Sequence, residues 1–252
     1  MPGLTTLLFD VDGTLAETEE VHRQAFNKAF AQAGLDWQWS PDRYRELLAV
    51  TGGKERIRHF IERHVPDFEP PMNLDEYIAG LHAAKTDIYT RMVETGQVPL
   101  RPGVRRLLEE ARRAGLRLGI ATTTTPANVT ALLRSSLAPD AMDWFDVIAA
   151  GGVVPAKKPA PDIYIHAMQL MGVSPDECLA FEDSENGVRS AKAAGLRTLV
   201  TVSDYTRGQD FSDADLVVDQ LGEPGAPARV LAGDLDGYDY ISVDALRRRF
   251  DG

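Results

Sequence analysis

Residues 5–14 read Thr5-Thr6-Leu7-Leu8-Phe9-Asp10-Val11-Asp12-Gly13-Thr14, an apolar run that ends in two carboxylates and a glycine-containing turn. The run predicts a buried strand, and the turn marks its exit. Side chains two positions apart on an extended chain point the same way, so Asp10 and Asp12 can face one small volume. Like charges held that close need a cation or a chemical role. The alternative is an ordinary Asp-Gly turn at a polar strand end, which would have no part in chemistry.

The chain beyond this strand is first helical and then alternates helices with strands. Apolar residues recur at helical spacing over residues 21–33, 57–64 and 74–92. Helices are then expected near 104–114, from 126 onward, at 161–171 and at 185–194, and strands near 116–121, 147–150, 178–181, 198–202 and 216–218. Short apolar strands separated by helices predict an α/β fold with a doubly wound, mostly parallel, Rossmann-like sheet covered on both faces.

The helical segment interrupts this α/β unit between its first and second strands. We therefore expect a core domain of residues 1–15 plus 99–252 and an inserted all-helical cap domain of residues 16–98. A chain of 252 residues is only modestly longer than one ordinary domain, which agrees with one core and one insertion. The segment after Asp219 reads as a surface loop, and the carboxyl-terminal residues that follow give no clear pattern.

Composition narrows the classes of function. The formal net charge of −11 argues against binding to nucleic acid or to an anionic membrane, although a local basic pocket can still accept a small anion. No apolar run approaches the roughly 20 residues of a membrane-spanning helix, and the first residues lack the pattern of a secretory signal. The single cysteine, Cys178, excludes an internal disulfide and a thiolate zinc cluster. We expect a soluble, cytoplasmic monomer.

Four polar clusters fall at predicted strand exits or in the loop just beyond, which is where ligands bind in open parallel sheets. They are Asp10 with Asp12, Thr122 with Thr123, Lys158, and Glu182 with Asp183. Taken singly, each has a simpler interpretation: a strand threonine, a solvated lysine, or a helix cap at Asp183 or Ser184. Thr125, which precedes Pro126, fits a helix N-cap better than a ligand.

The order of these clusters resembles the four motifs of the haloacid dehalogenase superfamily. The matching segments are Asp10-Val11-Asp12-Gly13-Thr14, the strand ending in Thr122, Lys158 before Pro159, and Glu182-Asp183-Ser184. The helical insertion resembles the cap of the β-phosphoglucomutase-like branch. Two further segments look most like the CbbY-type sugar phosphatases, Ala16-Glu17-Thr18-Glu19-Glu20-Val21-His22 and Thr51-Gly52-Gly53-Lys54-Glu55-Arg56. The resemblance covers nearly the whole chain except the carboxyl tail.

The resemblance implies a phosphatase in which Asp10 is the nucleophile and forms an aspartyl phosphate. Asp12 would protonate the departing alkoxide and then activate water. A carboxylate that attacks a phosphate ester meets a dianion, and one pair of like charges about 4 Å apart at an effective dielectric of roughly 20 repels by roughly 4 kcal/mol. Thr122 and Lys158 would bind the phosphoryl oxygens and, with a metal ion, offset that repulsion.

The implied metal ligands are Asp10, the backbone carbonyl of Asp12, and Asp183. All of them offer oxygen, and no histidine or cysteine cluster competes, which favours Mg²⁺ as the cofactor over zinc. Glu182 has two interpretations that stay open. It is either a further or water-mediated metal contact or an anchor for Lys158.

The expected substrate-binding residues are Glu17, His22, Gly52, Gly53, Lys54, Lys85 and Thr123. Lys85 interrupts an apolar helical stripe, so we expect it to lean toward a site between cap and core, the alternative being a stem that snorkels to solvent. His22 likewise shares an apolar face, where a satisfied core histidine is the alternative. Lys54 follows two glycines at a helix start, where backbone donors can meet an anion. Arg58 and Arg63 read as a solvated face.

These residues favour a small-molecule substrate with two anionic ends, one on Asp10 and one on the cap. The resemblance implies xylulose-1,5-bisphosphate, an inhibitor of rubisco, and so a place beside carbon fixation. A β-phosphoglucomutase-like phosphomutase is the alternative. In that branch a Lys-Asn pair grips the second phosphate, whereas Thr125-Pro126 stands here. A noncatalytic regulator is disfavoured because each catalytic position carries a competent side chain, and a dehalogenase needs neither Asp12 nor a metal.

Overall fold

The computed structural model describes residues 3–95 and 98–251. Its centre is a seven-stranded sheet of order β3-β2-β1-β4-β5-β6-β7. The strands are β1 (Thr6–Phe9), β2 (Arg117–Thr122), β3 (Val147–Ala150), β4 (Cys178–Glu182), β5 (Arg197–Thr201), β6 (Leu216–Val218) and β7 (Val230–Ala232). All neighbours pair in parallel except β6 and β7. Because β1 lies between β2 and β4, the strand order changes direction there, and ligands bind at such a point.

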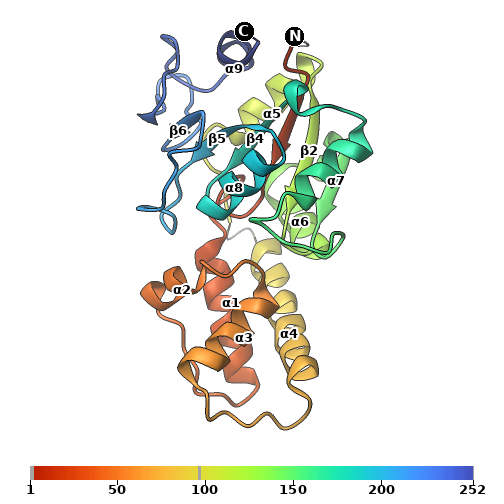
Figure 1. The fold of residues 1–252 in the computed structure, drawn as a ribbon, viewed down its shortest axis with the longest axis vertical. Coiled ribbons are helices and arrows are strands. Elements are labelled where there is room, and N and C mark those ends of the chain that lie inside the picture. Colours follow the sequence, from red (N-terminus) through yellow and green to blue (C-terminus); the bar gives the residue numbers. More distant parts are fainter. Residues whose placement is uncertain (1–2, 96–97, 252) are drawn as a thin grey trace.

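Helices cover both faces of the sheet, as the alternating side chains of β1 require (Figure 1). Leu7 and Phe9 belong to the cluster that α5 (Val104–Arg113), α6 (Pro126–Leu132) and α9 (Val243–Phe250) complete. Leu8 points to the other face, into the cluster formed with α7 (Asp162–Met171) and α8 (Glu185–Ala193). The predicted doubly wound α/β fold is confirmed.

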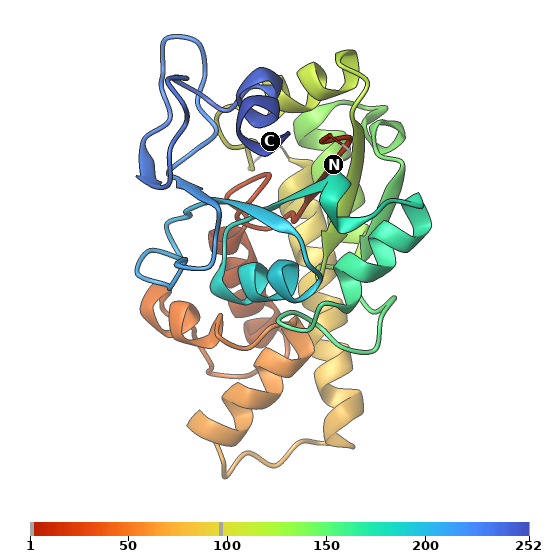
Figure 2. The same ribbon diagram turned by 45° about the horizontal axis from the view of Figure 1, so that its top comes forward.

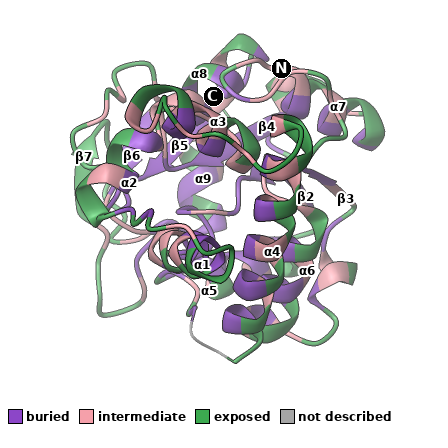
Figure 3. Ribbon diagram, turned by 90° about the horizontal axis from the view of Figure 1, so that it is seen from below, coloured by how far each residue is buried: buried purple, intermediate pink, exposed green. Residues whose placement is uncertain are grey.

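Of the helices that the structure describes between β1 and β2, the first four group together at one end of the molecule (Figure 1). They are α1 (Glu19–Gln32), α2 (Pro41–Leu47), α3 (Gly53–His64) and α4 (Leu74–Glu94). Seen from that end, α4 has a buried and an exposed side (Figure 3). An aromatic cluster that includes Phe26, Trp39 and Tyr44 fills the space between these helices. Tyr205, from the loop after β5, is buried in the same cluster.

The two chain crossings between the helices and the sheet lie side by side. Ala16 forms an antiparallel bridge with Leu100. The backbone N–H of Arg101 donates to the carbonyl of Leu15 at 2.9 Å. The outgoing and returning segments therefore hold each other where the helical unit joins the sheet.

The carboxyl-terminal segment is more ordered than the sequence indicated. Residues expected as a loop contain β7, and the tail forms α9, whose Ser242 hydroxyl accepts from the N–H of Ala245 at 3.1 Å. This segment runs along the β6 edge of the sheet (Figure 2). A strand of three residues is too short to show a period, so only its pairing with β6 reveals it. The seven-residue α2 escaped notice for the same reason. Within residues 3–95 and 98–251, no helix combines the length and apolarity needed to span a membrane.

Candidate active site

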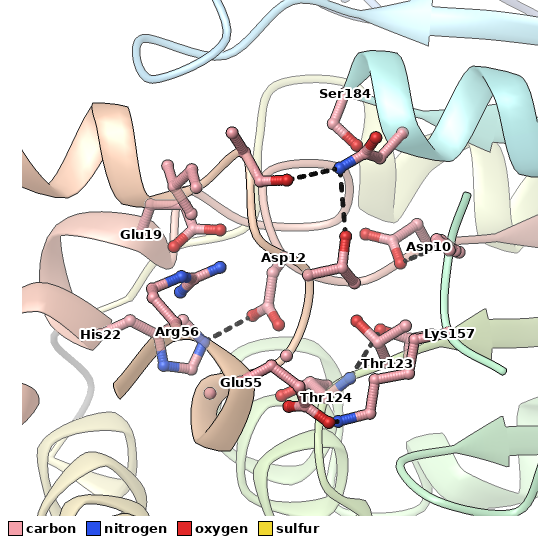
Figure 4. A pocket seen from close by; sticks show the side chains of 18 of the residues that line it. Asp10, Asp12, Glu19, His22, Glu55, Arg56, Thr123, Thr124, Lys157 and Ser184 are labelled. Atoms are coloured by element: carbon pink, nitrogen blue, oxygen red, sulfur yellow. Dashed lines mark hydrogen bonds and ion pairs between the residues drawn. The ribbon is translucent and has the colours of Figure 1, made fainter. Parts of the chain in front are cut away.

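A cavity of about 760 Å³ lies where the carboxyl ends of the strands meet the inserted helices. Its walls include residues from all four sequence clusters together with residues of α1, α3 and α4. Figure 4 shows Asp10 and Asp12 on the sheet side, with His22 and Arg56 across from them on the helical side. The topology produces this convergence because β1, β2 and β4 are adjacent and end at one edge.

Lys158 lies between two carboxylates at the bottom of the cavity. Its Nζ is 2.7 Å from Asp10 Oδ1 and 2.6 Å from Glu182 Oε1, and all three side chains are buried. Burial alone would lower the pKa of Lys158, but the two carboxylates raise it, so the amine stays charged. Burial raises the pKa of Asp10 to about 7, and the attraction of Lys158 limits that rise.

Asp10, Glu182 and Asp183 form a cluster that can hold a metal ion, since one carboxylate oxygen from each lies within 4.8 Å of the others. Burial raises the pKa of Asp183 well above its ordinary value, and the charges of Asp10 and Glu182 raise it further. Among the described residues, Glu182 Oε2 is a buried oxygen with no hydrogen-bond partner. A buried, all-oxygen set with more negative than positive charge fits a hard divalent cation.

Glu182 performs the anchoring role that sequence reasoning left open. Its Oε1 accepts from Lys158 Nζ and from the hydroxyl of Tyr164, both at 2.6 Å. Its second oxygen remains available to a metal ion or to a bound water. The N-cap of α8 is Ser184, because its hydroxyl accepts from the N–H of Gly187 at 3.2 Å. Asp183 therefore does not cap α8.

Asp12 is held by groups from α1 and the segment before it. Asp12 Oδ1 accepts from the Thr18 hydroxyl at 2.6 Å and lies 2.9 Å from His22 Nε2. Burial would raise the pKa of Asp12, but His22, Thr18 and the charge of Lys85 together lower it. Asp12 is therefore a carboxylate in this structure.

His22 connects Asp12 to the buried amine of Lys85. Lys85 Nζ lies 2.6 Å from His22 Nδ1, and the imidazole stacks on Tyr89 with ring centroids 4.0 Å apart. Burial lowers the pKa of Lys85 to about 7 and, with the charge of Lys85, lowers that of His22. When Lys85 donates to Nδ1, a neutral His22 carries its proton on Nε2 and donates to Asp12. The expectation that Lys85 leans toward the site agrees with this geometry.

The four consecutive threonines that begin at the last residue of β2 have different roles. Thr122 is buried and lines the cavity, and its hydroxyl accepts from the N–H of Thr124 at 3.3 Å. Thr123 also lines the cavity. Thr125 caps α6 by accepting from the N–H of Asn128 at 3.3 Å, so the N-cap interpretation is confirmed.

The structure brings most, but not all, of the expected substrate-binding residues to the cavity. Gly52, Gly53 and Lys54 line it at the start of α3, together with His22 and Lys85. Glu17 lies outside it, in a separate depression, with its carboxylate 3.2 Å from Arg101. Its backbone follows the bridge at Ala16, which turns this side chain away from the nucleophile.

Several lining residues were missed from the sequence. Lys157 Nζ lies 2.5 Å from Glu55 Oε1, which joins the sheet side to α3 across the cavity (Figure 4). Arg56 and His82 add positive or titratable groups to the helical wall. Burial, Lys85 and Lys54 lower the pKa of His82 to about 4, which reflects a basic surrounding. Two signals in the sequence could have found some of them: Lys157 is adjacent to Lys158, and Glu55 and Arg56 directly follow Lys54 in the segment that resembles the CbbY-type phosphatases.

Comparison with known proteins agrees with this site. Residues 4–195 match the family model for haloacid dehalogenase-like hydrolases. The chain is 54% identical to protein CbbY of Rhodobacter capsulatus over 225 residues, which cover 89% of this chain and 97% of that protein. It is 49% identical to protein CbbY of Cereibacter sphaeroides, with coverage of 89% and 96%.

Two solved structures extend the likeness to the fold. CbbY from Rhodobacter sphaeroides in complex with phosphate is 48% identical, with a TM-score of 0.80. A mutant of that protein in complex with xylulose-(1,5)bisphosphate is 49% identical, with a TM-score of 0.81. In both cases the match covers 86% of this chain and 94% of the other. A β-phosphoglucomutase from Clostridium difficile shares the fold, with 20% identity and a TM-score of 0.69. That match covers 86% of this chain and 91% of the β-phosphoglucomutase.

Proposed function

The chain belongs to the haloacid dehalogenase-like hydrolase family and is a phosphatase, and from that premise we propose that it hydrolyses a sugar bisphosphate through an aspartyl phosphate. Xylulose-1,5-bisphosphate is the proposed substrate, since a CbbY structure 49% identical to this chain was solved with that compound. The observation that carries the proposal is the buried contact of Lys158 with Asp10 beside two further carboxylates.

We propose Asp10 as the nucleophile. A carboxylate oxygen of Asp10 forms a bond to phosphorus as the bond from phosphorus to the sugar oxygen breaks. Lys158 and the Thr122 hydroxyl would bind phosphoryl oxygens, because both line the cavity together with Asp10. The resulting acyl phosphate is then attacked at phosphorus by water, which regenerates the carboxylate and releases inorganic phosphate.

Asp12 is the proposed acid and base. It would give a proton to the departing sugar oxygen and later accept one from the attacking water. The donors Thr18 and His22 favour its charged form at rest, which suits the second step. An incoming phosphate dianion disfavours a second negative charge nearby, so it raises the pKa of Asp12 and allows the first step.

The proposed cofactor is Mg²⁺, held by Asp10, Asp183 and the backbone carbonyl of Asp12. The buried carboxylate cluster and the free oxygen of Glu182 support a hard cation at this place. When bound, Mg²⁺ supplies positive charge to the phosphoryl group and to the nucleophile.

We propose residues 16–98 as a cap domain on a core of residues 1–15 and 99–252, with the second anionic end of the substrate held by the cap. Lys54 and Lys85 line the helical wall, and Lys157 lies beside them from the core. This basic wall on an otherwise acidic chain supports a substrate with two negative ends. We also propose a cytoplasmic monomer.

The test is phosphate release from a panel of phosphorylated sugars, with and without Mg²⁺. We expect xylulose-1,5-bisphosphate to give the highest kcat/KM, and Asp10→Asn to abolish release. A phosphomutase would instead need a bisphosphate activator and would return the phosphoryl group to sugar. Steady release of inorganic phosphate without an activator separates the two, and its absence for every sugar bisphosphate would contradict the proposal.

A further inference from the structure

Arg101 is a buried arginine at the place where the chain returns from the cap. It directly follows Leu100, which bridges Ala16, and its own N–H donates to the carbonyl of Leu15 at 2.9 Å. Its side chain is 5% exposed. Arg101 therefore belongs to the junction through which any movement of the cap reaches the core.

The guanidinium of Arg101 joins three separate segments through their backbone carbonyls. One nitrogen donates to Gly13 and, at 3.2 Å, to Thr201 at the end of β5. The other nitrogen donates to Val202 at 2.8 Å and to Asp219, just beyond β6, at 2.7 Å. Only the planar, five-donor fork of arginine can reach acceptors spread in this way.

Gly13 is the acceptor that matters for chemistry, because it directly follows Asp12. Its φ of +78° is a conformation that favours glycine, and the Asp183 carboxylate occupies the space where a side chain would stand. The turn is thus fixed by Asp183 on one side and by Arg101 on the other. Removal of the guanidinium would leave the Gly13 carbonyl buried without this donor.

Fold stability alone does not explain this arrangement. A buried charge is costly, and an apolar side chain of similar volume often stabilises a protein as well or better. The nearest counter-charge is Glu17 at 3.2 Å, and that carboxylate is 43% exposed. The Arg101 guanidinium is therefore surrounded mainly by backbone carbonyls, one of which is that of Gly13, next to Asp12.

We propose that Arg101 is a positioning residue for phosphoryl transfer. It holds the Gly13 turn so that Asp10 and Asp12 keep their alignment during the reaction. Arg101 lines a depression apart from the main cavity, so it would act through the turn and leave substrate contacts unchanged. The inference rests on the proposed function and adds to it a residue outside the substrate site.

The test compares Arg101→Ala and Arg101→Lys with a matched control, Arg106→Ala. Arg106 is also largely buried, and it donates to the carbonyls of Gly222 and Ile241 at 2.8 and 2.9 Å, far from the catalytic turn in the chain. Folding is checked by circular dichroism. The assay is steady-state phosphate release from xylulose-1,5-bisphosphate at saturating Mg²⁺, with and without millimolar guanidinium chloride.

We expect Arg101→Ala to lower kcat on the order of tenfold to a hundredfold, because small misalignment of reacting groups has effects of that size. KM should stay within about threefold, since uniform substrate binding is untouched. Guanidinium should restore part of kcat in Arg101→Ala, whereas Arg106→Ala should keep the wild-type kcat. Arg101→Lys should fall between, because a point charge can reach fewer of the carbonyls.

Three results would overturn the inference. They are a kcat within twofold of wild type, a loss equal to that of Arg106→Ala, or a loss in folded Arg101→Ala that guanidinium does not reverse. If Arg101→Ala does not fold, the comparison is made between Arg101→Lys and Arg106→Ala. A lower kcat in Arg101→Lys then supports the inference, and an equal kcat overturns it. Failure of the wild-type protein to release phosphate is a different outcome, because it contradicts the proposed function itself.

Discussion

Lys158 Nζ lies 2.7 Å from Asp10 Oδ1, so the nucleophile and its neutralising cation are in contact before any substrate binds. The contact keeps part of the nucleophile's charge compensated in a buried site. It also means that a phosphate entering the cavity meets an arranged set of charges, which need little reorganisation during the reaction.

Removal of the Lys158 amine should therefore lower the rate of phosphate release more than it lowers the stability of the fold. We expect Lys158→Met to lower kcat by about 10²-fold or more, as for other groups aimed at developing charge. The pKa of Asp10 should rise further, because burial and Glu182 would act without the opposing amine. Lys192→Met, which breaks a partly exposed pair with Asp215, is the control and should leave kcat unchanged. Equal losses in both variants would contradict this role.

The raised pKa of Asp10 has a consequence for stability. Between its ordinary value of 3.8 and about 7, the folded protein holds a proton that the unfolded chain has lost. Stability should therefore fall as pH rises through this window in the absence of metal. Asp10→Asn should reduce that slope, to which the raised pKa of Asp183 also contributes, and should raise Tm at pH 7 to 8 by a few degrees. Thermal melts of both proteins from pH 4 to 8 in EDTA provide the measurement, and parallel curves would refute the expectation.

Mg²⁺ should reverse this destabilisation, because it binds the ionised carboxylates of the folded state. We expect Tm to rise with Mg²⁺ concentration by several degrees, and the increment to be larger at pH 8 than at pH 6. Asp183→Asn should abolish the increment. Ser184→Ala, which removes the N-cap of α8 and costs about 1 kcal/mol of stability, should retain it. A Tm insensitive to Mg²⁺ at both pH values would exclude the metal site.

The cap lysines should discriminate bisphosphates from monophosphates. We expect Lys54→Ala to weaken binding of the bisphosphate about tenfold, as for loss of one charge-assisted contact, and to leave a sugar monophosphate unaffected. Arg58→Ala is the matched control, since Arg58 lies on the same helix in an exposed pair with Asp75. Isothermal titration into the inactive Asp10→Asn background measures both. If Asp10→Asn binds the bisphosphate with the same affinity with and without Lys54→Ala, Lys54 is not the contact.

The core of the site could be predicted because topology does most of the positioning. Thr122 ends β2, and Asp10 and Asp183 directly follow β1 and β4. These three strands are adjacent and parallel, so identifying them already brings the three residues together. Lys85 and His22 could be singled out because each interrupts an apolar stripe, and the structure joins them at 2.6 Å.

The remaining features depend on tertiary geometry that leaves no local pattern. Lys157 and Glu55 are 102 residues apart, and nothing near either one marks the other. Glu17 follows the first motif directly, yet the bridge at Ala16 turns it toward Arg101. The roles of Arg101 and of the edge strand β7 likewise emerge only from which backbone groups come together.

The inserted helices of residues 16–98 form one continuous stretch of sequence, but Tyr205, which lies outside that stretch, is part of their packing. Its ring packs edge-on against Tyr44, 5.7 Å between centroids, and its hydroxyl donates to Glu20, although it belongs to the loop after β5. A chimaera that exchanges residues 16–98 with a related enzyme would leave either a hole or a clash where this ring sits. Recombination between relatives should therefore succeed only when the loop that contains residue 205 travels with the insertion.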